Sequence, residues 1–265
     1  MIAVLGPEGT FSHELALALF GEKEVILIPT IHRIFDEVEK GSCDGLVPLE
    51  NSEAGGVGPT LDGLQGHAVS ITGEAFMEVH HHLAARGKPE DLILVYAHPQ
   101  THEQCSEFLE ELGIGVVHTS SNAASARAMQ EREGAGAIVS ELTARIYGLP
   151  IVRRDVQNNA GNTTRFILIS AMPPAESKPE KCSILIDPRE DRPGLLHDLL
   201  SVFARRGINL TRIESRPSKR GMGSYVFFVD IATDRGWEVA IRELHGLTHV
   251  KNLGCYRRLE VPGWR

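Results

Sequence analysis

The chain has 265 residues, of which 42% are hydrophobic and 23% are charged, as in a soluble globular protein of one or two domains. Its formal charge of −8 argues against a general nucleic-acid binder, which needs a basic face to neutralise phosphates. No apolar run approaches the roughly 20 residues of a membrane span, and the N-terminus lacks the features of a secretory signal. We therefore expect a cytoplasmic protein that binds neither nucleic acid nor membrane.

Short apolar runs alternate with helical patterns through the first 170 residues or so. The pattern predicts strands at 2–5, 25–28, 45–48, 92–97, 136–140 and 165–169. It predicts helices at 12–20 and 31–40, a third helix that begins at 101, and a fourth that follows the strand at 136–140 and ends at 147. Strands that alternate with helices are typical of a parallel α/β sheet with ligands at the strand C-termini. This many units favours two lobes around a cleft.

The segment 171–181, with three prolines and several charges, reads as a linker. We accordingly divide the chain into residues 1–171, a linker at 172–181 and a second domain at 182–265. The second domain has the order βαββαβ, with strands at 182–186, 208–215, 223–232 and 250–256 and helices from 193 and at 237–244. That order predicts a ferredoxin-like sandwich, which leaves a sheet face or edge open to a second copy.

The four cysteines, Cys43, Cys105, Cys182 and Cys255, are far apart and form no metal-ligand spacing. We expect four reduced thiols that mostly fill the core. The run His80 to His82 also predicts no metal site, because adjacent strand residues face opposite ways and no further ligand spacing accompanies the run.

Polar side chains follow several predicted strands, where ligands of α/β proteins bind. In most of these segments a cap or a turn explains the residues as well as a ligand does. The stretch Gly161 to Phe166 is different, because an arginine at the mouth of a buried strand is costly unless it meets an anion. Arginine is suited to holding a carboxylate with two hydrogen bonds, so this segment is the strongest candidate on local grounds.

Taken together, the segments GPEGTFS, VPLENSEAGGV, HPQTHEQC, SNAASA and GNTTRF closely resemble the prephenate dehydratases in order and separation. The stretch DRPGLLHDLLSVFARRGINLTRIESRP resembles the ACT domain that follows in this family. The resemblance covers almost the whole chain, and it is to the form without a preceding chorismate mutase region. It implies a two-lobed catalytic fold like that of a periplasmic binding protein, with prephenate in the cleft and without a metal or cofactor.

The resemblance also implies roles for individual residues. Thr164 would act on the departing hydroxyl, Glu50 or water would replace its proton, and Arg165 beside it would hold a carboxylate. Alternatively, Thr164 would only position the hydroxyl and stabilise charge. The expected substrate-binding residues are Thr10, Ser12, Asn51, Ser52, Gln100, Gln104, Asn122 and Phe166. The expected effector residues, for L-phenylalanine bound between the ACT domains of a homodimer or homotetramer, are Gly194, Leu195, Leu196, Asn209, Leu210, Glu214, Ser215, Arg216 and Pro217.

Two positions depart from the family pattern. Ala97 stands where the family often has a serine, and Leu195 stands where an alanine is usual, which would reshape the effector pocket. Two alternatives stay open: arogenate as the substrate, and a non-catalytic protein that senses amino acids. A sensor need not keep a hydroxyl beside the anchoring arginine, so Thr164 favours the enzyme.

Overall fold

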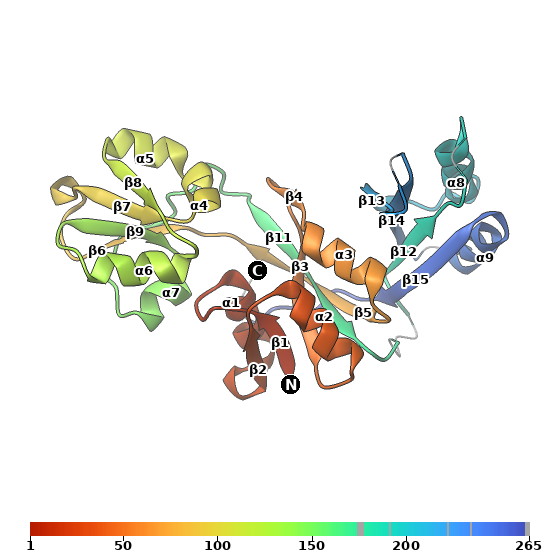
Figure 1. Ribbon diagram of the computed structural model, residues 1–265, viewed down its shortest axis with the longest axis horizontal. Helices are drawn as coiled ribbons and strands as arrows, with labels where there is room; N and C mark the ends of the chain where they lie inside the picture. The colour runs from red at the N-terminus through yellow and green to blue at the C-terminus, as the bar shows by residue number, and fades with distance from the viewer. Residues whose placement is uncertain (174–177, 191, 222, 234, 263–265) are drawn as a thin grey trace.

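A computed structural model describes residues 1–173, 178–190, 192–221, 223–233 and 235–262. Its strands form three sheets, which lie side by side along the longest axis of the molecule (Figure 1). We call the first two units lobe 1 and lobe 2, and the third the C-terminal sandwich. Within the described residues, none of the helices combines the length and the apolar character that a membrane crossing requires.

Lobe 1 is built on a sheet with the strand order β2-β1-β3-β11-β5, and β4 pairs with β3. Its strands are β1 (Ile2–Leu5), β2 (Val25–Ile28), β3 (Asp44–Asn51), β4 (Gly55–Gly56), β5 (Ser70–Glu78) and β11 (Thr163–Ser170). Its helices are α1 (Phe11–Phe20), α2 (Ile31–Glu39) and α3 (Gly58–Gly66), and a short 3-10 turn spans Glu22–Glu24. Helix α2 buries Ile31, Ile34, Phe35 and Val38, whose spacing places them on one face.

Lobe 2 has a sheet with the order β10-β6-β9-β7-β8. Its strands are β6 (His82–Ala85), β7 (Leu94–Ala97), β8 (Gly115–His118), β9 (Ala135–Val139) and β10 (Ile151–Arg153). Its helices are α4 (Pro99–Gln104), α5 (Ser106–Leu112), α6 (Asn122–Gln130) and α7 (Glu141–Ile146), with a 3-10 turn at Pro89–Asp91. The chain enters lobe 2 after β5 and returns after β10, so two strand connections form the hinge between the lobes (Figure 1).

Neither lobe has the purely parallel sheet that the alternation of strands and helices predicted. Strand β11 runs antiparallel to both β3 and β5, and β6 runs antiparallel to β9 and β10. The cause is the connectivity, because β11 returns to lobe 1 from lobe 2 instead of following a helix within its own sheet. The α/β class and the two lobes are confirmed.

The lobes touch through the loop after β1. The Gly9 carbonyl accepts a hydrogen bond of 2.6 Å from Thr143 Oγ1 and one of 3.4 Å from Ser140 Oγ, both on the first turn of α7 or its cap. Gly9 has a φ of +88°, and an added Cβ would lie 2.8 Å from Thr143 Oγ1. Only glycine combines this backbone conformation with so close an approach.

The C-terminal sandwich has the predicted βαββαβ order. It consists of β12 (Lys181–Asp187), α8 (Leu195–Ala204), β13 (Leu210–Pro217), β14 (Tyr225–Ala232), α9 (Trp237–Leu247) and β15 (His249–Tyr256), with the sheet order β13-β14-β12-β15. One face of the sheet packs on α8 and α9. The other face is not open, because Leu185, Val226, Phe228, Leu253 and Tyr256 share a core with lobe 1.

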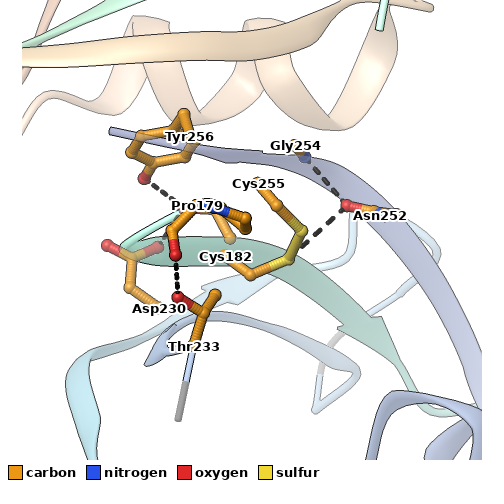
Figure 2. Close-up of a disulfide and its surroundings, with 9 residues drawn as sticks. Pro179, Cys182, Asp230, Thr233, Asn252, Gly254, Cys255 and Tyr256 are labelled. Carbon is orange, nitrogen blue, oxygen red and sulfur yellow. Dashed lines mark hydrogen bonds between the residues drawn. A yellow bond between two sulfur atoms is a disulfide. The ribbon is translucent and has the colours of Figure 1, made fainter. Parts of the chain in front are cut away.

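Cys182 and Cys255 lie directly opposite each other on β12 and β15 and form a disulfide (Figure 2). The prediction of four reduced thiols is therefore wrong for this pair. The two cysteines are 73 residues apart in the sequence, and only the sheet register brings them together. Cys43 and Cys105 are free, as expected.

Candidate active site

The centre of the candidate site is the pair Thr164 and Asn51, held by adjacent antiparallel strands. Thr164 on β11 is the register partner of Asn51 at the end of β3. Asn51 Nδ2 donates to Thr164 Oγ1 over 2.9 Å and to Asn162 Oδ1 over 2.6 Å. Asn51 Oδ1 accepts from the backbone N–H groups of Glu53 and Ala54, so both ends of the amide are fixed. Sequence reasoning named Asn51 and Thr164 but missed Asn162.

This arrangement orients the hydroxyl of Thr164. An amide nitrogen can only donate, so Thr164 Oγ1 acts as the acceptor in its contact with Asn51. The hydroxyl proton of Thr164 is then free to donate to another group. The pair therefore presents a directed hydrogen-bond donor beside the hinge.

His81 lies at the hinge between the lobes and contacts both of them. Its Nε2 lies 3.0 Å from Gln104 Oε1 in lobe 2, and its ring meets the ring of Phe11 edge to face at 5.5 Å. Burial lowers the pKa of His81 to about 4, so the ring is neutral at physiological pH. His81 Nδ1 is buried and has no hydrogen-bond partner among the described residues.

Sequence reasoning considered the histidine run only as a metal tract and did not recognise His81. The run lies where β5 leads into β6, at a lobe boundary that the sequence analysis did not locate. Of the predicted substrate residues, Gln104 is the one that contacts this histidine.

Arg165 does not stand beside Thr164, and the prediction that the two side chains face one groove is wrong. Successive residues of a strand point to opposite faces, so Thr164 and Arg165 are directed apart. Arg165 is only 3% exposed and lies between lobe 1 and the C-terminal sandwich. Its guanidinium donates to Glu74 at 2.7 Å, Glu50 at 2.9 Å, Asp230 at 2.6 Å and the Tyr256 hydroxyl at 2.9 Å.

Burial alone would lower the pKa of Arg165, but the charge of Asp230 and the groups beside it raise this pKa above its ordinary value. The guanidinium is therefore permanently charged, and three protein carboxylates and the Tyr256 hydroxyl engage it. It is not available to hold a carboxylate of a substrate in this structure.

Glu50 and Phe166 also lie elsewhere than expected. The Glu50 carboxylate pairs with Arg165 and, at 2.8 Å, with Arg212 Nε on β13, on the same face as Arg165 and not toward Thr164. The prediction that Glu50 replaces the proton of Thr164 is therefore wrong. Phe166 is buried in the core of lobe 1 with Leu15, Leu46 and Met77, which contradicts contact with a substrate.

Several of the remaining predicted residues make the local contacts of caps and turns. Thr10 is the N-cap of α1, and its Oγ1 also donates to the Leu5 carbonyl. Ser52 Oγ accepts from the Thr163 N–H, which ties the end of β3 to β11. Asn122 Oδ1 accepts from Thr101 Oγ1, so that it joins α6 to α4, while Ser121 is the actual cap. Ser12 is buried in α1, and Gln100 is exposed in the first turn of α4.

A cavity of about 1030 Å³ lies between the lobes and the segment after β15. Thr163, the residue before Thr164, contributes to its wall, as do Glu14, His80, Arg154 and Arg258. Burial raises the pKa of Glu14 in this wall to about 7. None of the predicted substrate residues lines the cavity.

In the C-terminal sandwich, two of the predicted effector residues contact lobe 1. Glu214 pairs with Arg212 of its own strand, and its carboxylate lies against Gly56 of lobe 1. Arg216 lies 3.3 Å from Asp62 on α3. Their neighbours Ile213, Ser215 and Pro217 are exposed on β13, which is an edge strand. Gly194 precedes α8 with a φ of +80°, Leu195 packs on the sandwich core, and Leu196 is exposed.

The fold and the site define a two-lobed α/β protein with an oriented hydroxyl at its hinge and a βαββαβ sandwich docked on lobe 1. Residues 2–174 match the family model described as prephenate dehydratase, and residues 186–249 match that of the ACT domain. The chain belongs to the prephenate dehydratase family.

Individual relatives agree with this membership. The chain is 31% identical to the prephenate dehydratase of Bacillus subtilis over 98% of this chain and 99% of the relative. It is 39% identical to a bifunctional chorismate mutase/prephenate dehydratase of Stutzerimonas stutzeri, of whose length it spans 64%. A crystal structure of a prephenate dehydratase from Arthrobacter aurescens in complex with L-Phe is 32% identical, with a TM-score of 0.87 over 99% of this chain and 93% of that one.

Proposed function

We propose that the chain catalyses the decarboxylative dehydration of prephenate to phenylpyruvate, a step of L-phenylalanine biosynthesis. The observation that carries the proposal is the hydroxyl of Thr164, oriented by Asn51 in a chain of this family. In the reaction the bond to the ring carboxylate breaks, the carboxylate leaves as CO2, and the electron pair of that bond enters the ring. The C4 hydroxyl takes up one proton and leaves as water. The driving force is the aromatic ring that forms.

Thr164 would donate its free proton in a hydrogen bond to the departing hydroxyl. A threonine hydroxyl is a very weak acid, and Glu50 is engaged by Arg165 and Arg212 on the other face of the sheet. We therefore assign Thr164 to positioning and stabilising the developing charge, with water as the source of the proton. Asn51 orients the Thr164 hydroxyl through its hydrogen bond, and Asn162 orients the side-chain amide of Asn51 in the same way.

The direct test is to add prephenate to the purified protein and to measure phenylpyruvate by its absorbance in alkali. Thr164→Val keeps the shape of the side chain and removes the hydroxyl, so we expect kcat to fall roughly 100- to 1000-fold. Thr164→Ser should retain most of kcat. The matched control is Thr72→Val, which removes a hydroxyl from the neighbouring strand β5 outside this site and should leave kcat near the wild-type value.

Normal turnover by Thr164→Val would overturn the role of this residue. No turnover of prephenate by the wild type would favour one of the two alternatives. Incubation with arogenate, followed by measurement of the L-phenylalanine formed, separates them. A faster reaction with arogenate would make the chain an arogenate dehydratase, whereas no reaction with either substrate would leave an amino-acid-sensing protein.

We also propose that L-phenylalanine regulates the enzyme by binding between the ACT domains of two chains. Strand β13 is an edge of its sheet and exposes Ile213, and Tyr225 of β14 is exposed further along the same hairpin, opposite Pro217. An edge strand with exposed apolar residues is a template for pairing with a second copy. Ile213→Asp should therefore reduce both the oligomer, measured by light scattering, and the affinity for L-phenylalanine, measured by calorimetry.

The ion pairs around Arg165 supply a route from the ACT domain to the active site. Asp230 on β14 holds Arg165, and Arg212 on β13 holds Glu50. Arg165 follows Thr164 in the sequence, and Glu50 precedes Asn51, so each ion pair holds the neighbour of a site residue. A shift of β13 and β14 on effector binding would thus move the strand ends that carry the site. Asp230→Asn should keep the affinity for L-phenylalanine and weaken its effect on kcat or KM.

A further inference from the structure

Three potential ligand atoms converge on the outer surface of lobe 1, away from Thr164. They belong to His32 and Asp36, one turn apart on α2, and to His67, the residue that follows α3. One ligand atom of each residue lies within 4.8 Å of the other two. His67 Nε2 is 3.2 Å and His32 Nε2 is 4.0 Å from Asp36 Oδ1.

These separations suit a small divalent ion. Zinc binds imidazole nitrogen and carboxylate oxygen at about 2.0 to 2.2 Å, which places tetrahedral ligand atoms roughly 3.3 Å apart. The contact between His67 and Asp36 already has this length, and His32 is 74% exposed and can turn toward the ion. Two imidazoles and one carboxylate leave a fourth position for water.

A second observation concerns the hydrogen bonds of His67. Its Nδ1 lies 3.1 Å from the Gly63 carbonyl oxygen, so Nδ1 carries the proton and donates it. In the neutral ring Nε2 then presents its lone pair to the carboxylate of Asp36, and two acceptors face each other at 3.2 Å. A cation between them removes this repulsion. A ring nitrogen that donates to a backbone carbonyl is also the usual support of a metal-binding histidine.

Groups of both signs of charge surround His67. His67 lies at the C-terminal end of α3, where the helix dipole is negative. The backbone there is held by the ACT domain, because Lys251 Nζ on β15 donates to the carbonyls of Leu64 and His67 at 2.7 and 2.6 Å. An ion that joins α2 to this end of α3 would fix the helix on which the ACT domain rests.

We propose that His32, Asp36 and His67 form a binding site for one divalent transition-metal ion of the zinc class, which clamps α2 to α3. The sequence spacing does not indicate it, since Asp36 and His67 are 31 residues apart. The site is independent of the proposed catalytic residues, and its role is structural.

The test uses Co²⁺ and Zn²⁺ with the full chain, purified without a polyhistidine tag. The wild type should bind one Co²⁺ with the visible absorption bands of imidazole ligation, and Zn²⁺ should displace it. His32→Gln should weaken binding about 10-fold or more, and so should His67→Gln. His32 is exposed, so its loss leaves the fold intact even if His67→Gln is unstable.

The matched control is His245→Gln, which removes an exposed histidine at the far end of the ACT domain and should leave the affinity unchanged. If the wild type binds no Co²⁺, or if His32→Gln binds it as tightly as the wild type, the proposal is wrong. In that case His67 and Asp36 form an ion pair alone.

Discussion

Arg165→Met separates the two roles that Arg165 could have. As a substrate anchor the residue would affect mainly KM, and its loss would leave the fold as stable as before. In the structure Arg165 instead neutralises Glu74 and Asp230, whose side chains are 7% and 3% exposed. Methionine keeps most of the volume and removes the charge. Asp230 would then remain buried without a cationic partner, whereas Glu74 would keep Lys181 at 2.8 Å.

Breaking a buried pair by removal of one partner costs about 3 to 5 kcal/mol, because an uncompensated charge stays behind. We expect Arg165→Met to lose this much free energy of unfolding, measured by urea denaturation. The matched control is Arg154→Met, which breaks a two-point ion pair with Glu141 on the surface, where both side chains are more than half exposed. Exposed pairs are worth about 0.2 to 1 kcal/mol, so the control should change little.

A double-mutant cycle completes the test. Asp230→Asn alone should also destabilise the chain, and the loss in the double variant should be smaller than the sum of the two single losses, because the residues share one contact. An Arg165→Met variant with wild-type stability and a raised KM would refute the buried role and restore the substrate anchor.

Three further predictions follow from single contacts. Burial holds the pKa of His81 at about 4, against 6.5 in the unfolded chain. The unfolded state therefore takes up the proton first, and the free energy of unfolding falls as the pH drops from about 6.5 to 4. His81→Gln should remove up to about 3 kcal/mol of this loss, measured by urea denaturation at several pH values. Gly63→Ala places a Cβ against the ring of Phe35 and should cost about 1 to 3 kcal/mol of unfolding free energy. The control is Gly66→Ala on the same helix, whose Cβ meets nothing within 4 Å and which should be neutral or slightly stabilising. Equal effects of the two substitutions would contradict the packing of Gly63 on Phe35. Cys255→Ser opens the loop that the disulfide closes and should cost up to about 4 kcal/mol of unfolding free energy. A thiol count on the unreduced, denatured wild type should give two free thiols, and a count of four would show that the pair is reduced.

Local pattern predicted much of the fold. The βαββαβ order of the ACT domain and helix α2 are visible in the sequence because apolar residues recur at the period of each element. Strand β5 and helix α3 were missed. Glycines at 55, 56, 58, 63 and 66 obscure the helical pattern of α3, since glycine is a poor helix former on its own.

Site residues were predictable only in part. Asn51 and Thr164 lie at strand ends, where the sequence placed them, but the orientation of Arg165 was not recognised. Strand alternation already implied that Arg165 faces away from Thr164. Its partners Glu74 and Asp230 are 91 and 65 residues away, so no local signal identifies them. The pairing of Cys182 with Cys255 is hidden in the same way.

The shared core between the ACT sheet and lobe 1 limits how the proposed regulation could be lost. A fragment that stopped before Lys181 would expose the apolar surface beneath Leu185, Phe228 and Leu253 and would deprive Arg165 of Asp230. Such a truncated chain should aggregate or unfold rather than work as an unregulated enzyme. Insensitivity to an effector is thus accessible to evolution through substitutions within the ACT domain and not through its deletion.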